Sequence, residues 1–349
     1  MIHFGTFLLM QSPSMRSSQE IYARAVDIAQ AAETLGFRNI WLAEHHFSTY
    51  GYVSRPAQLA TYLAAKTTRL RVGTAVIVVP LHHPLVIAEE IATLDQLAGG
   101  RVDIGLGRGY QHYEFERLGL ELDTARARWE ESVDIILKAF AGKPFTYHGK
   151  LFDIPETTIF PQPLQTPHPP IWVTAQSPES VEATVRRGFN LLTGGFGVPI
   201  ERMADFRRQF DRLIAEVKPP RMPDVGVQRA VYVTDTVEGG GARHRRPRAE
   251  GAGYRRPARP LPRHRHAGHR DPSDQARAGT RRHHPLQLQL LVRRHRAPAH
   301  HEVDDALRQR GAAGVQVRCG FSTCPPNSKR MAESSRSWKS DSPRELKRW

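Results

Sequence analysis

Two adjacent histidines, His45 and His46, follow Glu44 in the segment Phe37-Arg-Asn-Ile-Trp-Leu-Ala-Glu-His-His-Phe47. An imidazole titrates near neutral pH, so it can hold or move a proton, and a neighbouring carboxylate can orient it. If a strand runs through both histidines, their side chains point to opposite faces and only one can face a ligand. We therefore expect one histidine to act on a ligand and the other to be structural; a buried core histidine is the alternative interpretation.

A second adjacent pair, His82 and His83, makes zinc an alternative ligand for the four histidines. Zinc sites need several ligand atoms converging on one point, as His-x-His spacing on one face of a strand allows. Adjacent histidines do not provide that spacing, and we expect no metal.

The segment Gly105-Leu-Gly-Arg-Gly-Tyr110 is rich in glycine. It does not match a dinucleotide fingerprint, because the third glycine would fall where Tyr110 stands. The glycines still allow the backbone to approach a ligand closely, and Arg108 can present its planar guanidinium to a phosphate. A surface arginine in a tight turn is the alternative.

The segment Gln176-Ser-Pro-Glu-Ser180 is typical of a helix start, with Ser177 as the N-cap and Pro178 in the first turn. Such a start offers free backbone N–H groups to an anion, and the hydroxyls of Ser177 and Ser180 add to them. Helix capping alone is the simpler interpretation, and the two roles are compatible.

Strand-like runs alternate with helical patterns over the first two thirds of the chain, which predicts parallel strands joined by helices. We expect strands at 2–8, 39–44, 70–79, 102–107, 171–175, 190–193 and 225–234, with an eighth at 315–318, and helices at 19–35, 56–66, 85–97, 124–140, 178–187 and 200–217. A hairpin is expected at 145–154. The order predicts an α/β fold, a (β/α)8 TIM barrel, with an open doubly wound sheet as the alternative. In a barrel the segments containing His45, Arg108 and Gln176 all follow strand ends, where active sites of this fold lie.

The composition changes abruptly near residue 237. Residues 1–237 hold 24 Lys+Arg and 25 Asp+Glu, a net charge of −1, whereas residues 238–349 hold 26 and 10, a net +16, which together give +15. The tract 238–301 is rich in Arg, His and Pro, and we predict that it is disordered or translated out of frame. Residues 302–321 read as a final helix and strand, and the basic tail 322–349 again reads as out of frame. Sequencing the DNA across codons 234–325 would test this interpretation.

These motifs, in this order, resemble the bacterial luciferase-like flavin-dependent monooxygenases. The resemblance covers residues 2–234 and resumes over 302–321. It rests on His3-Phe-Gly-Thr-Phe7, the histidine segment, Val72-Gly-Thr-Ala-Val76 with Pro80 and His83-Pro84, Leu94–Arg101, Gly107-Arg-Gly-Tyr110 and Ile171–Ser177. It implies a luciferase-like barrel with an aberrant C-terminal third.

The resemblance also implies the cofactor and the residues around it. Reduced FMN would react with O2 at the barrel mouth to give a flavin peroxide that oxygenates a small organic substrate such as an aldehyde. By position, His45 is the catalytic residue, and the cofactor-binding residues are Ala75, Val76, Arg108, Glu114, Gln176, Ser177 and Ser180. Ala75-Val76 matches a junction where the family has a non-proline cis peptide. Gln176 stands where the luciferase subunit has a carboxylate, a departure that would alter flavin binding there.

The expected partners are a small-molecule substrate, O2 and a separate NAD(P)H-dependent flavin reductase, with a homodimer if the chain is folded. The sequence has no membrane-length apolar run and no secretory leader pattern, so we expect a cytoplasmic protein that binds neither membrane nor specific nucleic acid. Two alternatives stay open: a deazaflavin-dependent oxidoreductase of the same fold, and an inactive flavin-binding remnant whose basic tail binds polyanions.

Overall fold

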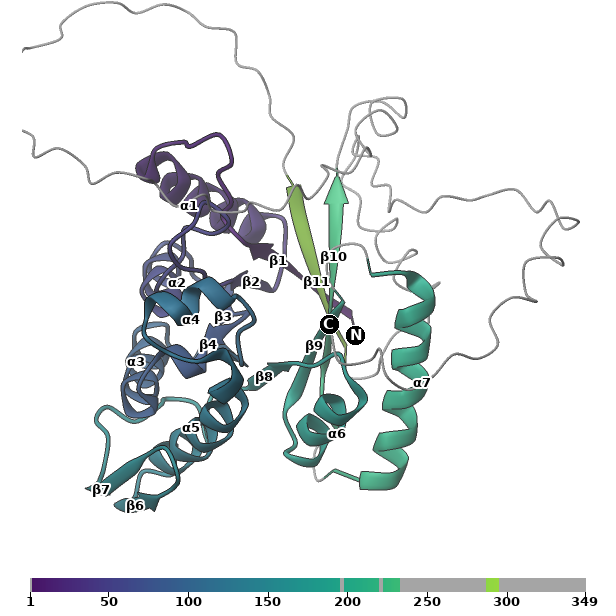
Figure 1. The fold of residues 1–349 in the computed structure, drawn as a ribbon. Coiled ribbons are helices and arrows are strands. Elements are labelled where there is room, and N and C mark those ends of the chain that lie inside the picture. The colour runs from purple at the N-terminus through teal and green to yellow at the C-terminus, as the bar shows by residue number, and fades with distance from the viewer. Residues whose placement is uncertain (1, 195–197, 220–221, 233–286, 295–349) are drawn as a thin grey trace, which may run out of the picture.

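The computed structural model describes residues 2–194, 198–219, 222–232 and 287–294 (Figure 1). A curled sheet forms the centre of this part of the chain, and helices cover its outside. The strands of the sheet are β1 (Ile2–Leu8), β2 (Asn39–Leu42), β3 (Arg71–Thr74), β4 (Ile77–Val78), β5 (Val102–Gly107), β8 (Ile171–Thr174), β9 (Asn190–Gly194), β10 (Val225–Tyr232) and β11 (Gln287–Arg294). The helices are α1 (Ser18–Thr34), α2 (Pro56–Ala65), η1 (Val79–Leu81), α3 (Pro84–Leu97), α4 (His112–Arg117), η2 (Leu122–Thr124), α5 (Ala125–Phe140), α6 (Pro178–Arg186) and α7 (Ile200–Val217). The predicted hairpin is present as β6 (Phe145–His148) and β7 (Asp153–Thr157).

The sheet closes on itself. Its strands follow the order β3, β2, β1, β11, β10, β9, β8, β5, and β5 pairs in turn with β3, while β4 continues the path of β3 along β5. All pairings in the ring are parallel except the two made by β11. The structure therefore confirms the barrel and not the open sheet.

The eighth position of the ring differs from the prediction. β11 fills it and pairs antiparallel with β1, from Ile2 opposite Arg294 to Phe7 opposite Gln289, and antiparallel with β10 on its other side. These residues lie in the tract 238–301, for which we expected disorder or an out-of-frame sequence, and disorder is wrong for this strand. The segment 286–292 reads Leu-Gln-Leu-Gln-Leu-Leu-Val and is the richest in aliphatic residues within that tract, which favours a strand here. The strand predicted at 315–318 lies outside the described residues.

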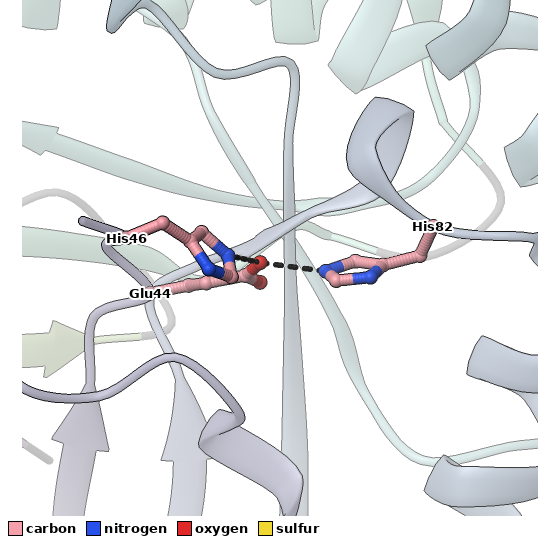
Figure 2. A group of neighbouring side chains, drawn as sticks. All are labelled: Glu44, His46 and His82. Carbon is pink, nitrogen blue, oxygen red and sulfur yellow. Dashed lines mark hydrogen bonds and ion pairs between the residues drawn. The ribbon is translucent and has the colours of Figure 1, made fainter. Parts of the chain in front are cut away.

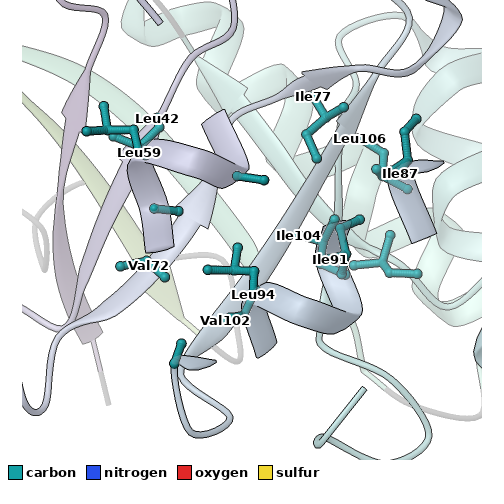
Figure 3. Packing of buried hydrophobic residues seen from close by; sticks show 14 of the residues in the cluster. Leu42, Leu59, Val72, Ile77, Ile87, Ile91, Leu94, Val102, Ile104 and Leu106 are labelled. Carbon is teal, nitrogen blue, oxygen red and sulfur yellow. The ribbon is translucent and has the colours of Figure 1, made fainter. Parts of the chain in front are cut away.

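Two apolar layers hold the barrel together. The outer layer packs the strands against α1, α2, α3 and α5, and Figure 3 shows part of it around Ile91, Ile104 and Leu106. The inner layer contains Trp41 and Trp172, whose rings meet edge to face at 5.3 Å, and fills the barrel beneath its mouth. A ligand must therefore bind above this layer, at the carboxyl ends of the strands.

None of the helices in the described part of the chain combines the length and the apolar composition that a membrane span needs.

Candidate active site

A cis peptide bond joins Ala75 to Val76 between β3 and β4. Two glycines of β5 make room for it: a Cβ at Gly105 would lie 2.0 Å from the Thr74 carbonyl oxygen, and one at Gly107 would lie 2.2 Å from Val76 Cγ2. The alternating glycines of this strand therefore have a steric reason. Residues 75–78, which we call the cis-peptide segment, lie at the barrel mouth and split the single strand predicted at 70–79 into β3 and β4.

His45 lies beside this segment and is paired with a buried carboxylate. Its Nδ1 is 3.0 Å from Oε1 of Glu114, and His45 and Glu114 are 7% and 1% exposed. The same oxygen accepts the backbone N–H of His46 at 2.9 Å. Since an ionised carboxylate only accepts, the proton of a neutral His45 is on Nδ1, and Nε2 remains available to accept a proton. The sequence placed Glu114 near the cofactor, which stays a prediction, and the structure adds its contact with the ring of His45.

Two tyrosines border the ring of His45. Tyr50 meets it edge to face at 4.7 Å and Tyr110 at 6.0 Å, and the two hydroxyls are 3.5 Å apart. Burial, together with the hydrogen bond to Tyr50, raises the pKa of Tyr110, so its phenol stays protonated at neutral pH. Neither tyrosine was among the predicted site residues, although Tyr110 closes the glycine-rich motif.

The segments containing Arg108 and Gln176 leave neighbouring strands at the same edge of the barrel, because β5 pairs with β8. Arg108 follows β5 directly, is exposed, and has no hydrogen-bond or ion-pair partner within the described part of the chain. Gln176 donates its Nε2–H to the carbonyl oxygen of Gly194 at 3.3 Å, which links the ends of β8 and β9.

Ser177 and Ser180 form a reciprocal capping box at the start of α6. The Oγ of Ser177 accepts the N–H of Ser180 at 3.3 Å, and the Oγ of Ser180 accepts the N–H of Ser177 at 3.1 Å. Capping is therefore confirmed. The positive end of α6 also lies next to the strand that leads into Arg108, an arrangement suited to an anion.

The second histidine of the pair, His46, belongs to a different cluster (Figure 2). Its Nε2 is 2.8 Å from Oε1 of Glu44, and Nε2 of His82 is 2.6 Å from the same oxygen. Burial alone would raise the pKa of Glu44, but the hydrogen bonds from His46 and His82 lower it to about 2. These three residues have the chemistry of metal ligands. Of the four histidines considered for zinc, the structure brings together His46 and His82.

His45 and His46 do lie in different surroundings, but strand alternation does not place them there. β2 ends at Leu42, so neither His45 nor His46 is in a strand. They separate because different carboxylates bind them, Glu114 for His45 and Glu44 for His46. The two side chains lie in different surroundings, as expected, but strand alternation is not the reason. That one of them acts on a ligand stays a prediction.

Comparison of the chain with known proteins relates it to one protein family. A model of the luciferase-like monooxygenase family matches residues 2–316. The oxygenase component of a flavin-dependent trigonelline monooxygenase from Acinetobacter baylyi is 32% identical over 240 residues, which are 68% of this chain and 66% of that protein. The alkanal monooxygenase alpha chain of the Kryptophanaron alfredi symbiont is 31% identical over 189 residues, 54% of this chain and 53% of that one. Among solved structures, monooxygenase RslO1 from Streptomyces bottropensis superposes with a TM-score of 0.60 at 28% identity, covering 63% of this chain and 68% of that one. The matched region thus spans between about half and two thirds of these proteins.

Proposed function

Because the chain belongs to the luciferase-like monooxygenase family, we propose that it is a flavin-dependent monooxygenase that uses reduced FMN and O2 to oxygenate a small organic substrate. The observation that carries the proposal is the arrangement at the barrel mouth. Three neighbouring strands of the sheet, β2, β3 and β5, lead into this arrangement. His45 follows β2, the cis bond between Ala75 and Val76 follows β3, and the exposed Arg108 follows β5. Glu114, the partner of His45, lies in α4 after β5.

The described residues fit a flavin phosphate at one side of the mouth. Arg108 is a cation with no protein partner among the described residues. The helix α6 begins shortly after β8, the strand that pairs with the β5 strand leading into Arg108. A guanidinium with a helix N-terminus is a favourable setting for a phosphate. Ser177 and Ser180 can add hydroxyl contacts there, and Gln176 lies at the start of the same turn.

The isoalloxazine ring would rest on the cis-peptide segment. Gly105 and Gly107 permit that backbone to lie where it does, and Trp41 and Trp172 pack against Ala75 and Val76. When bound, the reduced flavin supplies the electrons that activate O2.

His45 is the residue that we assign to proton transfer. Glu114 holds its Nδ1–H, which leaves Nε2 to take up or deliver a proton at the site of reaction. The surrounding phenols of Tyr50 and Tyr110 limit the approach of solvent to the ring.

An aldehyde is our proposal for the substrate, supported by the name of the alkanal monooxygenase relative. The trigonelline enzyme shows that relatives differ in substrate. Its name, an oxygenase component, supports a separate flavin reductase as the partner of this chain. The homodimer stays a prediction.

The test is anaerobic titration of the full-length chain with photoreduced FMN, followed by flavin fluorescence, with reduced deazaflavin F420 titrated in parallel. We expect FMN to bind more tightly, and admission of O2 with decanal as the probe aldehyde to yield decanoic acid. Tighter F420 binding with hydride transfer would instead support the deazaflavin oxidoreductase. Flavin binding with no oxygenation of any aldehyde in a chain-length series would support the inactive remnant.

A further inference from the structure

Glu44 contacts the cis-peptide segment at two points. Its backbone N–H donates to the carbonyl oxygen of Val76 at 3.3 Å, and its Oε2 accepts the backbone N–H of Val78 at 2.8 Å. Val78 is 4% exposed, so without the carboxylate its N–H would be buried without a partner. A single residue, two positions after the end of β2, thus holds both sides of the segment.

The other oxygen of Glu44 holds two further loops. Oε1 accepts from Nε2 of His46, in the loop that follows β2, and from Nε2 of His82, in the loop between η1 and α3 (Figure 2). The three side chains are 0%, 10% and 8% exposed. His46 directly follows His45, so this cluster also fixes the loop that positions the proton-transfer residue.

Arg55 determines the protonation of His82. Its Nη1 lies 3.0 Å from Nδ1 of His82. A guanidinium can only donate, so Nδ1 accepts, and the ring proton is on Nε2, facing Glu44. The carboxylate of Glu44 is therefore surrounded by N–H donors, from His46, His82 and the backbone of Val78.

The same geometry disfavours a metal ion. A metal bound at Nε2 would move the proton of His82 to Nδ1, where it would face the donor of Arg55, whereas metal-bound histidines normally present that proton to an acceptor. Ligands about 2.0 to 2.1 Å from a tetrahedral zinc lie roughly 3.3 Å apart. The two nitrogens are closer than this to Oε1 of Glu44, at 2.8 and 2.6 Å, as hydrogen bonds require.

We propose that Glu44 is a positioning residue that acts through the cis-peptide segment and His46, with the Nε2–H of His82 as the donor that keeps its carboxylate in place. The proposal rests on the proposed function in one respect, since it takes the cis-peptide segment as the support for the flavin ring. It assigns Glu44 no contact with flavin or substrate.

The first test is Glu44→Gln in the full-length chain. The amide replaces one acceptor oxygen with an N–H2 group that faces the existing donors, so we expect the Kd for reduced FMN to rise about tenfold or more. Asp95→Asn is the matched control, because Asp95 is also a fully buried carboxylate and accepts the N–H and Nε2–H of Gln165 at 2.8 and 2.7 Å, outside the site. We expect it to lower the thermal midpoint and leave the Kd unchanged.

A second pair of variants separates the hydrogen bond that His82 donates to Glu44 from the packing of its side chain. In His82→Gln the side-chain amide can replace the Nε2–H donor, so we expect flavin affinity near that of the wild type, whereas His82→Leu should lose it. This pair decides the question if Glu44→Gln does not fold. Equal affinity in wild type and Glu44→Gln, or in His82→Gln and His82→Leu when both are reduced, would overturn the proposal.

Nitrogen-15 spectra of the histidine rings give a readout that does not need flavin. We expect the signals of an Nε2–H ring for His82, and loss of that signal pattern in Glu44→Gln. If the wild type shows these signals but binds no flavin, the proposed function fails and the hydrogen-bonded cluster stands. Stoichiometric zinc or iron in the purified chain that is lost with Glu44→Gln would overturn the proposal in favour of a metal site.

Discussion

Oε1 of Glu114 binds both the ring of His45 and the backbone of the next residue, His46, at 3.0 and 2.9 Å. This one buried oxygen therefore determines which ring nitrogen of His45 carries the proton. It also holds the backbone N–H of His46, and with it the peptide next to His45. Because α4 supplies Glu114, the short helix after β5 controls the histidine that follows β2.

This relationship predicts different effects for the two adjacent histidines. We expect His45→Ala to lower decanal turnover by about 100-fold or more, the scale of losing a positioned acid or base, with reduced FMN still bound. His46→Ala should act mainly on stability and loop position. Turnover, flavin affinity and thermal midpoint of both variants, compared with Glu114→Gln, would test this. Equal losses of turnover, or a larger loss for His46→Ala, would contradict the assignment of His45.

The phosphate site predicts a loss of flavin affinity for Arg108→Ala. A charge-assisted contact to phosphate is worth about 1.5 to 3 kcal/mol, so we expect the Kd for reduced FMN to rise by more than about tenfold. Arg69→Ala is the matched control, because Arg69 is also exposed but precedes β3 at the opposite end of the barrel. Fluorescence titration of both variants would measure the difference. Unchanged affinity in Arg108→Ala would mean that Arg108 is a turn residue.

The barrel could be predicted from the sequence because each strand and helix has a local signal. The bounds of β1, β5 and α7 agree with those predicted, and the alternation of strands with helices gave the closed order. Position at strand ends then selected His45 and Arg108 without knowledge of their neighbours. The cis bond at Ala75-Val76 followed from the family resemblance and is confirmed.

The pairings within the site could not be predicted, because they depend on contacts between distant segments. Glu114 lies 69 residues after His45 and comes from a helix of six residues, too short to show a helical period. Glu44 and His82 are 38 residues apart, and their contact depends on how the loop after η1 folds. The antiparallel β11 was missed because a short aliphatic run in an Arg-rich tract gives little local indication of its partners.

Glu33 lies outside the site, and its hydrogen bonds predict a contribution to the free energy of unfolding that depends on pH. Its Oε1 accepts the backbone N–H groups of Thr68, Arg69 and Leu70 at 2.9, 2.6 and 2.8 Å. Burial opposes ionisation, but these hydrogen bonds lower the pKa of Glu33 below its ordinary value of 4.5. Its contribution is therefore complete above the unfolded pKa and is lost as pH falls through the lower, folded pKa.

We expect Glu33→Gln to lower the free energy of unfolding by about 1 kcal/mol at pH 7, a value reduced for partial solvent exposure. The difference from wild type should shrink as the pH falls below the ordinary pKa value of 4.5. Urea denaturation at a series of pH values would measure it. A difference that stayed constant, or grew, as the solution was acidified would show that the charge of Glu33 is not the cause.

The final prediction concerns β11, the strand that closes the barrel between β1 and β10. Its Leu290 lies opposite Thr6 of β1 and Arg229 of β10, so its backbone is between two partners. Proline has no N–H and is rarely accommodated within a central strand, and we expect Leu290→Pro to destabilise the barrel by more than about 1 kcal/mol, the scale of a lost backbone hydrogen bond. Leu290→Ala keeps the backbone N–H and separates the loss of the ladder from the loss of the side chain. Thermal unfolding, with hydrogen exchange of β1 and β10, would compare them: if both variants unfold at the same temperature and β1 keeps its protection, then β11 does not close the barrel, and the eighth position is open to the segment predicted at 315–318.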